Sequence, residues 1–411
     1  MDQMKGNCMA IFNSNDIYPV SADSELPFAQ HRDMFHLAGI DQEETILILY
    51  PSSKDSKTRE NLFIRRSDEH TKIWEGEKLS KDLASELSGI ESIHFIEDFK
   101  NILHLISSKV DTFYINKNEH YRANSPVETR EDRFISWLLK KYPAHKVAKS
   151  NPILQRLRSI KHIDEINQIR KACQITKKGF NRVLKFIKPD VWEYQIEAEF
   201  IHEFINNSSK GFAYSPIIAS GQDNNVLHYV KNNKQCKDGE LILMDVGAEY
   251  GNYSSDMTRT IPVSGHFSKR QKEIYNTVLR VKNEATKLLT VGNNWKNFHD
   301  QVGEIMTKEL LDINLLDKAD IKNQTKKNPA YKKYFMHGTS HHLGLDTHDY
   351  GLLDDLFQEN MVFTVEPGIY IPEEGFGVRL EDDVVIQTKG EPINLMEDIP
   401  IETDHIEELM N

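Results

Sequence analysis

The sequence is poor in cysteine and in long apolar runs. It has only 3 cysteines among 411 residues, Cys8, Cys173 and Cys236, and no two of them have the C-x-x-C spacing. This small, odd number excludes a disulfide framework and argues against a cysteine zinc site. The first twenty residues place polar or charged side chains in every short apolar run, and no run reaches the ~18 residues of a membrane helix. We therefore expect no signal peptide and no membrane span, and we predict a cytoplasmic protein.

Positive charge is also scarce. The chain has 51 Lys and Arg against 63 Asp and Glu, a formal net charge of −12, and 39% of its residues are hydrophobic. An acidic chain lacks the basic stripe that neutralises nucleic-acid phosphates and the polybasic patch that binds anionic lipids. We therefore expect neither a nucleic-acid nor a membrane partner. At roughly 150 residues per domain, the length predicts two or three domains.

The first part of the chain alternates short strands with helices. A helix is predicted over Arg130–Lys140, and strands over four apolar runs: Met9–Phe12, Thr45–Tyr50, Ile93–Ile96 and Thr112–Ile115. This alternation is typical of an α/β domain. The polar stretch Ala144–Pro152, which ends in Asn-Pro, is the predicted boundary. The predicted domains are therefore residues 1–150 and 151–411.

The rest of the chain separates its helices from its strands. Apolar residues at steps of three and four predict four helices, near 160–184, 193–207, 298–311 and after Ser268, which has a capping-box glutamine at 271. Strands are predicted over Leu241–Val246, Thr258–Ile261, Val362–Val365 and Val384–Ile386. Because these elements do not alternate strictly, we predict an α+β domain with an antiparallel sheet.

Two aspartates lie where apolar runs begin or end. Asp245 stands near the end of the run Leu241–Val246, where a buried strand would normally have another aliphatic residue. A buried carboxylate costs several kcal/mol unless a cation or hydrogen-bond donors compensate it. Asp256 follows the turn 247–255, so adjacent antiparallel strands would bring the two carboxylates together. Alone, either aspartate is more often an ordinary turn residue.

Histidines gather in one short block. The stretch MHGTSHHLGLDTHD at residues 336–349 contains His337, His341, His342 and His348. A single histidine has about even odds of being an ordinary core or surface residue. Four within so few residues, interleaved with two glycines, indicate a metal or acid–base site.

Two glutamates repeat the pattern of the aspartates. Glu366 directly follows the aliphatic run Val362–Val365 and precedes Pro-Gly, and Glu381 lies in the segment GVRLEDD. Arg379 stands two residues before Glu381, so on a strand both side chains face the same side. An arginine there can hold a ligand carboxylate in place. The alternative is an ordinary surface ion pair, which contributes little.

Together these residues make a candidate metal site. Four carboxylates cannot share one pocket without cations. The candidate ligands are Asp245, Asp256, His341, Glu366 and Glu381. Oxygen ligands with one imidazole favour Mn²⁺, with Zn²⁺, Co²⁺ or Fe²⁺ as alternatives. The donors suffice for two divalent metal ions, as in dinuclear hydrolases.

The order Asp, Asp, His, Glu, Glu with these flanks resembles the pita-bread metallopeptidases, the family of methionine aminopeptidase, prolidase and aminopeptidase P. The resemblance covers about 157–386, and the motif 337–349 is most similar to the aminopeptidase P branch. Tyr18-Pro19 and the segment FHLAG at 35–39 resemble the N-terminal domain of that branch, which methionine aminopeptidases lack. The resemblance implies a C-terminal pita-bread fold preceded by an α/β, creatinase-like N-terminal domain.

The resemblance also implies how the metal ligands divide their work. Asp245 would bind one ion, His341 and Glu366 the other, and Asp256 and Glu381 both. Glu366 would also assist as general base for a hydroxide that bridges the two ions.

Further residues match the substrate-binding positions of the family. His228, in the segment VLHY, and His348 match two histidines that contact the substrate and stabilise the tetrahedral intermediate. His337 would line the pocket for the proline side. Tyr214, Tyr370 and Arg379 fit supporting positions around that pocket.

The activity implied is a metal-dependent aminopeptidase that releases the N-terminal residue from peptides with proline in second position. Attack by the metal-bridging hydroxide would cleave the bond, and the family implies a homodimer or homotetramer. One alternative is a prolidase restricted to Xaa-Pro dipeptides. Another is an inactive pita-bread protein that only binds partners, although the presence of all five ligands argues against it.

Overall fold

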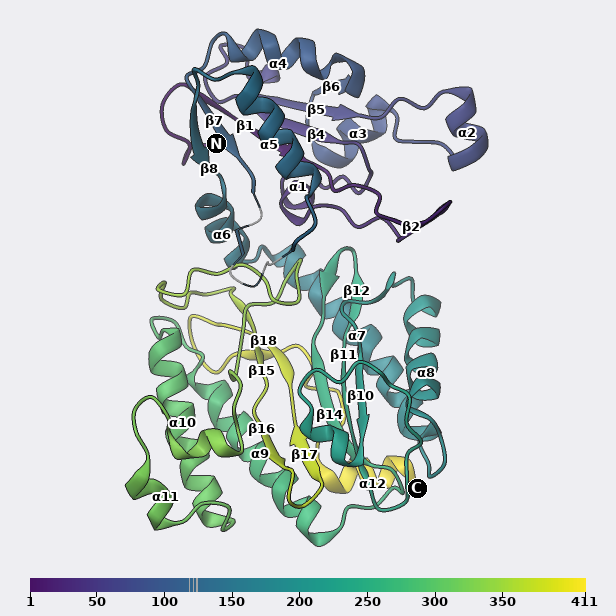
Figure 1. Cartoon of the computed structure of the whole chain (residues 1–411), viewed down its shortest axis with the longest axis vertical. Helices are drawn as coiled ribbons and strands as arrows, with labels where there is room; N and C mark the ends of the chain where they lie inside the picture. The colour runs from purple at the N-terminus through teal and green to yellow at the C-terminus, as the bar shows by residue number, and fades with distance from the viewer. Residues whose placement is uncertain (118, 121, 123–124) are drawn as a thin grey trace. The chain divides into compact units, whose positions relative to one another are not determined.

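The chain folds into two units, Met1–Arg156 and Leu157–Asn411. The computed structural model describes residues 1–117, 119–120, 122 and 125–411. Each unit has its own sheets and helices, and the two are described separately below (Figure 1).

A six-stranded sheet forms the centre of the N-terminal unit, with the order β6-β5-β4-β1-β7-β8. Its strands are β1 (Cys8–Asn13), β4 (Ile46–Leu49), β5 (Glu60–Ile64), β6 (Ser92–Phe95), β7 (Thr112–Ile115) and β8 (Lys146–Lys149). The central strand β1 pairs antiparallel with β4 and parallel with β7. Its side chains alternate between two hydrophobic clusters: Ala10 and Phe12 belong to one, and Met9 and Ile11 to the other. Both faces of β1 are therefore buried, as its unbroken apolar sequence requires.

Helices accompany this sheet, and a small hairpin of β2 (Pro19–Ser21) and β3 (Ser24–Glu25) precedes the first of them. The helices are α1 (Arg32–Ala38), α2 (Glu69–Glu75), α3 (Lys81–Ser88), α4 (Phe99–Ser107) and α5 (Arg130–Lys141). The four predicted strands and the predicted helix at 130–140 are all present. The polar stretch 144–152 contains β8 and the start of α6 (Asn151–Ser159). Most of β8 is exposed, so its polar sequence gives no sign of a strand.

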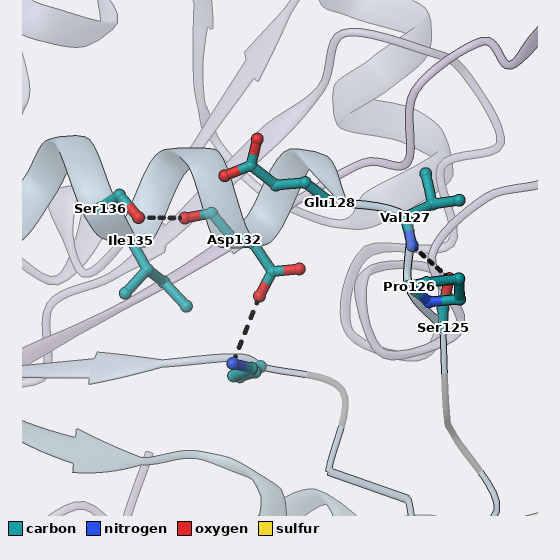
Figure 2. Close-up of a pocket in the computed structure, with 8 residues that line it drawn as sticks. Ser125, Pro126, Val127, Glu128, Asp132, Ile135 and Ser136 are labelled. Atoms are coloured by element: carbon teal, nitrogen blue, oxygen red, sulfur yellow. Dashed lines mark hydrogen bonds and ion pairs between the residues drawn. The ribbon is translucent and has the colours of Figure 1, made fainter.

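A pocket of about 450 Å³ lies at the start of α5, lined by Lys117, Asp132 and residues around Ser125–Glu128 (Figure 2). Within it, Lys117 Nζ lies 3.5 Å from Asp132 Oδ1. The Val127 amide donates to Ser125 Oγ at 3.2 Å. None of the residues that line this pocket is a predicted site residue.

The C-terminal unit is α+β, and its paired strands are antiparallel. One sheet has the order β10-β11-β14, a second β15-β18-β19 and a third β13-β12-β9. Strands β16 and β17 form a separate hairpin. The strands are β9 (Gly211–Phe212), β10 (Ile217–Ser220), β11 (Leu241–Val246), β12 (Ala248–Tyr250), β13 (Tyr253–Ser254), β14 (Met257–Pro262), β15 (Val362–Val365), β16 (Gly368–Ile371), β17 (Phe376–Arg379), β18 (Asp382–Val385) and β19 (Ile393–Asn394). The predicted antiparallel arrangement is therefore confirmed for the described pairs.

Long helices cover these strands (Figure 1). They are α7 (Ile163–Phe186), α8 (Glu193–Asn206), α9 (Lys269–Leu288) and α10 (Trp295–Asp312), followed by the short α11 (Lys318–Asn323) and α12 (Thr403–Met410). Helix α7 packs against α8 and β12, and α9 packs against α10, β15 and β17. The capping box at Ser268 and Gln271 starts α9 as the sequence predicts. No helix of the described chain is both long and apolar enough to cross a bilayer.

Candidate metal centre

The pairing of β11 with β14 brings the two predicted aspartates together. Asp245 stands opposite Thr258 in this antiparallel pair, and Asp256 directly precedes β14. The Tyr214 hydroxyl lies 2.6 Å from Asp245 Oδ1 and 2.5 Å from Asp256 Oδ1. One hydroxyl thus contacts both carboxylates, so Tyr214 lies between them.

The backbone of Asp256 is fixed by a residue that sequence reasoning missed. Asp383, at 0% exposure, accepts hydrogen bonds from the Asp256 amide at 3.0 Å and from Cys173 Sγ at 3.4 Å. Burial, together with the nearby Asp256, raises the pKa of Asp383 well above its usual value. The run of three acids that starts at Glu381, in front of the apolar residues 384–386, was the available signal. Cys173 is a buried residue of α7, as predicted, but it is also part of this contact.

His341 faces the carboxylates with its Nε2 atom. This atom lies 3.4 Å from Asp256 Oδ2 and 3.7 Å from Glu366 Oε1. On the other side of the ring, Nδ1 lies 2.9 Å from the carbonyl oxygen of His342. Because a carbonyl can only accept, Nδ1 donates its proton there, and Nε2 is the ring nitrogen that faces the carboxylates. The ring is therefore oriented as a metal ligand requires.

The two glutamates reach the same place from different strands. Glu366 follows β15, and its amide donates to the carbonyl oxygen of Thr339 at 2.8 Å. Glu381 is held against β14, since its amide donates to the Thr258 carbonyl and its Oε2 accepts from Thr258 Oγ1 at 2.7 Å. Donor atoms of Asp256, His341 and Glu381 all lie within 4.8 Å of one another. Three of the five predicted ligands thus form one compact group, Glu366 lies beside it, and Asp245 adjoins it through Tyr214.

Arg379 is a buried residue of the site, not a surface ion pair. Its Nη2 donates to Asp245 Oδ2 at 2.7 Å, its Nη1 to the Tyr370 hydroxyl at 2.9 Å and its Nε to Thr258 Oγ1 at 3.2 Å. The side chain is only 4% exposed. Of the two roles left open by the sequence, the structure thus favours holding the Asp245 carboxylate in place.

The surroundings of the site disfavour the charged form of its carboxyl groups. Burial and the neighbouring carboxylates raise the pKa of Asp256 and of Glu381 well above the usual range. For Glu366, burial outweighs the attraction of His341 and raises the pKa to about 7. Buried carboxylates gathered in this way are stabilised by cations, and carboxylate oxygens with one imidazole nitrogen suit a divalent ion. The residues present therefore fit a divalent metal.

His337 is held neutral at the edge of this group. Its Nδ1 lies 2.7 Å from the Gly338 carbonyl oxygen, and its Nε2 lies 2.7 Å from the Tyr370 hydroxyl. Burial, with the charges of Arg379 and His228 nearby, lowers its pKa to about 3, while burial raises that of Tyr370 to about 12. Nδ1 therefore donates to the carbonyl, and Tyr370 donates to Nε2. Arg379, Tyr370 and His337 form a chain of hydrogen bonds that leads away from Asp245.

The remaining predicted histidines approach the group from two loops. The His348 ring packs on that of the ligand candidate His341, with centroids 3.9 Å apart. His228 is exposed and lies near enough to His337 to lower its pKa. Its neighbour Tyr229 is buried in a cluster with Tyr370. All of the predicted site residues thus lie in the C-terminal unit.

Comparisons with known proteins agree with this geometry. Residues 167–388 match the model of metallopeptidase family M24, and residues 1–114 match the aminopeptidase P N-terminal domain. The chain is 32% identical to the Xaa-Pro aminopeptidase of Escherichia coli, covering 100% of this chain and 95% of that protein. It is also 32% identical to human Xaa-Pro aminopeptidase 3, over 96% of this chain and 79% of the relative.

Solved structures give the same result for the fold. Zinc-substituted E. coli aminopeptidase P in complex with product superposes with a TM-score of 0.88 at 30% identity, covering 100% of this chain and 95% of that one. An aminopeptidase of Pseudomonas aeruginosa superposes with a TM-score of 0.90 at 29% identity, with the same coverage. A fold shared over the full chain confirms the predicted pita-bread domain with its preceding α/β domain.

The class defined by this fold and site is that of the metal-dependent peptidases. The chain belongs to metallopeptidase family M24, in its aminopeptidase P branch. The predicted enzyme class, a metallo-exopeptidase that uses divalent metal, is thereby confirmed.

Proposed function

We propose that this protein releases the N-terminal residue from peptides whose second residue is proline. The observation that supports this most strongly is the buried group of carboxylates around His341, in a chain that matches both domains of the aminopeptidase P branch. Proline lacks an amide hydrogen and fixes its own φ angle, so its peptides need a dedicated pocket.

The proposed cofactor is a pair of divalent ions, with Mn²⁺ favoured and Zn²⁺, Co²⁺ or Fe²⁺ as alternatives. The residues that would hold them are Asp245, Asp256, His341, Glu366 and Glu381. When bound, such a pair makes hydroxide available near neutral pH and polarises the carbonyl that is attacked. The two oxygens of Asp256 have different neighbours, since Oδ1 contacts the Tyr214 hydroxyl and Oδ2 faces His341. This central place, beside Glu381, supports the proposal that Asp256 and Glu381 would be ligands common to both ions.

Glu366 is the residue best suited to accept a proton from the attacking water. Its side chain is 20% exposed, against 7% for Asp256, so it faces the open side of the group. In the metal-free protein its pKa is raised to about 7, so near neutral pH the carboxyl group can both give up and take up a proton.

His228 and His348 are the proposed donors to the oxygen that becomes negative as the carbonyl is attacked. A donor aimed at that oxygen is worth about 10²–10³ in rate. Tyr214 holds Asp245 and Asp256 together. His337 and Tyr370 form the proposed wall for the proline side, and Arg379 fixes both Tyr370 and Asp245. This wall is neutral and partly aromatic, which suits an apolar ring.

A prolidase restricted to Xaa-Pro dipeptides is the second candidate, since the same metal ligands would serve it. We would compare hydrolysis of Ala-Pro-Ala and Ala-Pro by Mn²⁺-loaded protein with that by chelator-treated protein. Release of alanine from the tripeptide, lost with the chelator, is the expected result. Cleavage of the dipeptide alone would replace the proposal with the prolidase, and cleavage of neither would favour a protein that only binds partners.

Two further expectations from the sequence remain proposals. The cytoplasmic location fits the three buried, unpaired cysteines, Cys8, Cys173 and Cys236. A homodimer or homotetramer is proposed from the family resemblance. Sedimentation of the purified chain with Mn²⁺ would give the number of subunits directly.

A further inference from the structure

We infer that Glu193 and Tyr229 are positioning residues, which set the place of His228 relative to the carboxylate group. This inference rests on the proposed function, because it takes His228 as the residue that contacts the substrate. Neither residue contacts the metal ligands directly. Both act through the segment 226–234, named here the His228 loop.

The structure describes all nine residues of the His228 loop, and none of them lies in a helix or strand. The loop therefore depends on contacts with other parts of the fold to hold its position. A backbone without regular pairing is held only by the side chains and carbonyls that it contacts. Val226, His228 and Val230 are exposed, and Tyr229 is 8% exposed. The buried Tyr229 side chain therefore anchors the loop in the fold, while the His228 side chain is exposed to solvent.

Glu193 is the residue to which the loop is tied. It is the first residue of α8, 0% exposed, and its carboxylate accepts four hydrogen bonds. Two come from the end of β10, from the amide and hydroxyl of Ser220 at 2.8 and 2.7 Å. Two come from the loop, from the Tyr229 hydroxyl at 2.8 Å and the Lys234 amide at 3.0 Å. An acid in the first turn of a helix is ordinary. Glu193, however, links the end of β10 to two points of the His228 loop, and these four hydrogen bonds are called the clamp below.

The clamp connects His228 to the metal centre through β10. The first residue of β10, Ile217, stands opposite Asp245 in the pairing of β10 with β11. The Tyr229 ring packs in one cluster with Ile217 and Tyr370. Asn232 adds a third tie, since its Oδ1 accepts from the Ile218 amide at 3.0 Å. The loop is therefore fixed to the strand that pairs beside Asp245 and to the tyrosine that contacts His337.

The chemistry of the clamp predicts what its loss would do. A displacement of about 1 Å in a group that contacts the reacting atoms can cost 10²-fold in rate. Glu193→Gln keeps one acceptor oxygen and places an N–H₂ group against a backbone amide, that of Lys234 or that of Ser220, so one side of the clamp is lost in either orientation. Tyr229→Phe removes one hydroxyl only. We expect kcat to fall about 10-fold or more for Glu193→Gln and about 3-fold for Tyr229→Phe. We expect KM and the metal content to stay near those of the wild type.

Two variants on the same helix serve as matched controls. Tyr194→Phe alters an exposed tyrosine next to Glu193, and Glu199→Gln alters a glutamate that pairs with Arg182. Both should keep the wild-type kcat. Each clamp substitution is then repeated in a His228→Ala background, where a residue that acts through His228 has nothing left to position.

The inference holds if kcat falls in the single variants and the loss disappears in the His228→Ala background. It is overturned if Tyr229→Phe and Glu193→Gln both keep the wild-type kcat, or if their losses persist undiminished without His228. Deuterium uptake of the His228 loop tests the clamp without any activity, and should rise in Glu193→Gln but not in Glu199→Gln. If the wild type cleaves no Xaa-Pro peptide, the proposed function fails while this exchange measurement still decides the clamp. If Glu193→Gln does not fold, Tyr229→Phe decides the inference alone.

Discussion

Each unit of the chain contains a glutamate whose pKa is raised to about 7, Glu131 in the N-terminal unit and Glu366 in the C-terminal unit. In both cases burial is the main cause. Glu131 has a neutral partner, the Asn13 amide, which donates to its Oε2 at 2.7 Å, and its charged neighbours on α5 include Arg130. Glu366 has Asp256 and Asp245 nearby, which raise its pKa further, while His341 and Arg379 lower it.

Burial alone therefore does not make a metal site. One proton removes the charge of a single buried carboxyl such as Glu131, and nothing else is required. Four carboxylates in one place, with the Nε2 atom of His341 facing them, are a donor set that a divalent cation stabilises. A single proton compensates the charge of such a set only in part. The predictions below test this contrast, beginning with the largest expected effect.

Removal of a shared ligand should have the largest effect. We expect Asp256→Ala or Glu381→Ala to lose bound metal and at least about 10³-fold in kcat together, because metal-ion catalysis supplies several kcal/mol. Metal content by mass spectrometry and the rate on Ala-Pro-Ala measure both. Asp398→Ala, at an exposed aspartate, is the control. Full metal content with full activity in Asp256→Ala would contradict a shared ligand.

Removal of the proposed oxyanion donor should have a smaller effect of a different kind. His228→Ala is expected to lower kcat by about 10² while metal content stays at the wild-type level, since His228 is not a proposed ligand. The same two measurements separate it from the ligand variants. A loss of metal equal to that of Asp256→Ala would contradict the proposed role of His228 as a donor that does not bind metal.

The affinity for Mn²⁺ should depend on pH because the metal competes with protons. The raised pKa of Glu366, about 7 without metal, means that a proton is present below that pH and must leave when metal binds. Affinity should therefore rise at least about 10-fold from pH 6 to pH 8. Calorimetric titrations of chelator-treated protein at the two pH values measure this. An affinity that does not change with pH would argue against protonated ligands in the metal-free protein.

The smallest effect is expected at Glu131, where a proton suffices. Its pKa is raised from 4.5 to about 7, so between these values the folded state binds more protons than the unfolded state. Stability from this group is therefore lost as pH rises towards 7. Glu131→Gln lacks this titration. Its free energy of unfolding, measured relative to that of the wild type, should therefore be about 1–3 kcal/mol higher at pH 8 than at pH 5. Urea unfolding at both pH values tests this gain, and kcat and metal content should not change.

A good part of the fold and site could be predicted from the sequence. Leu241–Val246 and Val362–Val365 were predicted with the bounds observed, because both strands are almost entirely buried and their sequences are mainly apolar. The meeting of Asp245 with Asp256 followed from the pairing of two neighbouring strands, although the segment 247–255 between them forms the strands β12 and β13 and is not a simple loop. Edge strand β8 was missed because exposed strands have no such pattern.

What could not be predicted are the contacts between residues far apart in the chain. Asp383 supports the Asp256 amide, and Glu193 binds both Ser220 and Tyr229, only because the strands and helices pack as they do. No periodicity signals such contacts, since each residue alone resembles an ordinary strand or helix terminus. The supporting residues of the site therefore became visible only with the structure.

The most direct test of the account is to count the metal ions that restore activity. Chelator-treated protein would be titrated with Mn²⁺ at pH 8, while bound metal and the release of alanine from Ala-Pro-Ala are followed together. The account predicts about two ions per chain, with activity absent before the addition and returning as the ions bind. Activity that survives complete removal of metal, or a folded chain that binds no Mn²⁺, would contradict it.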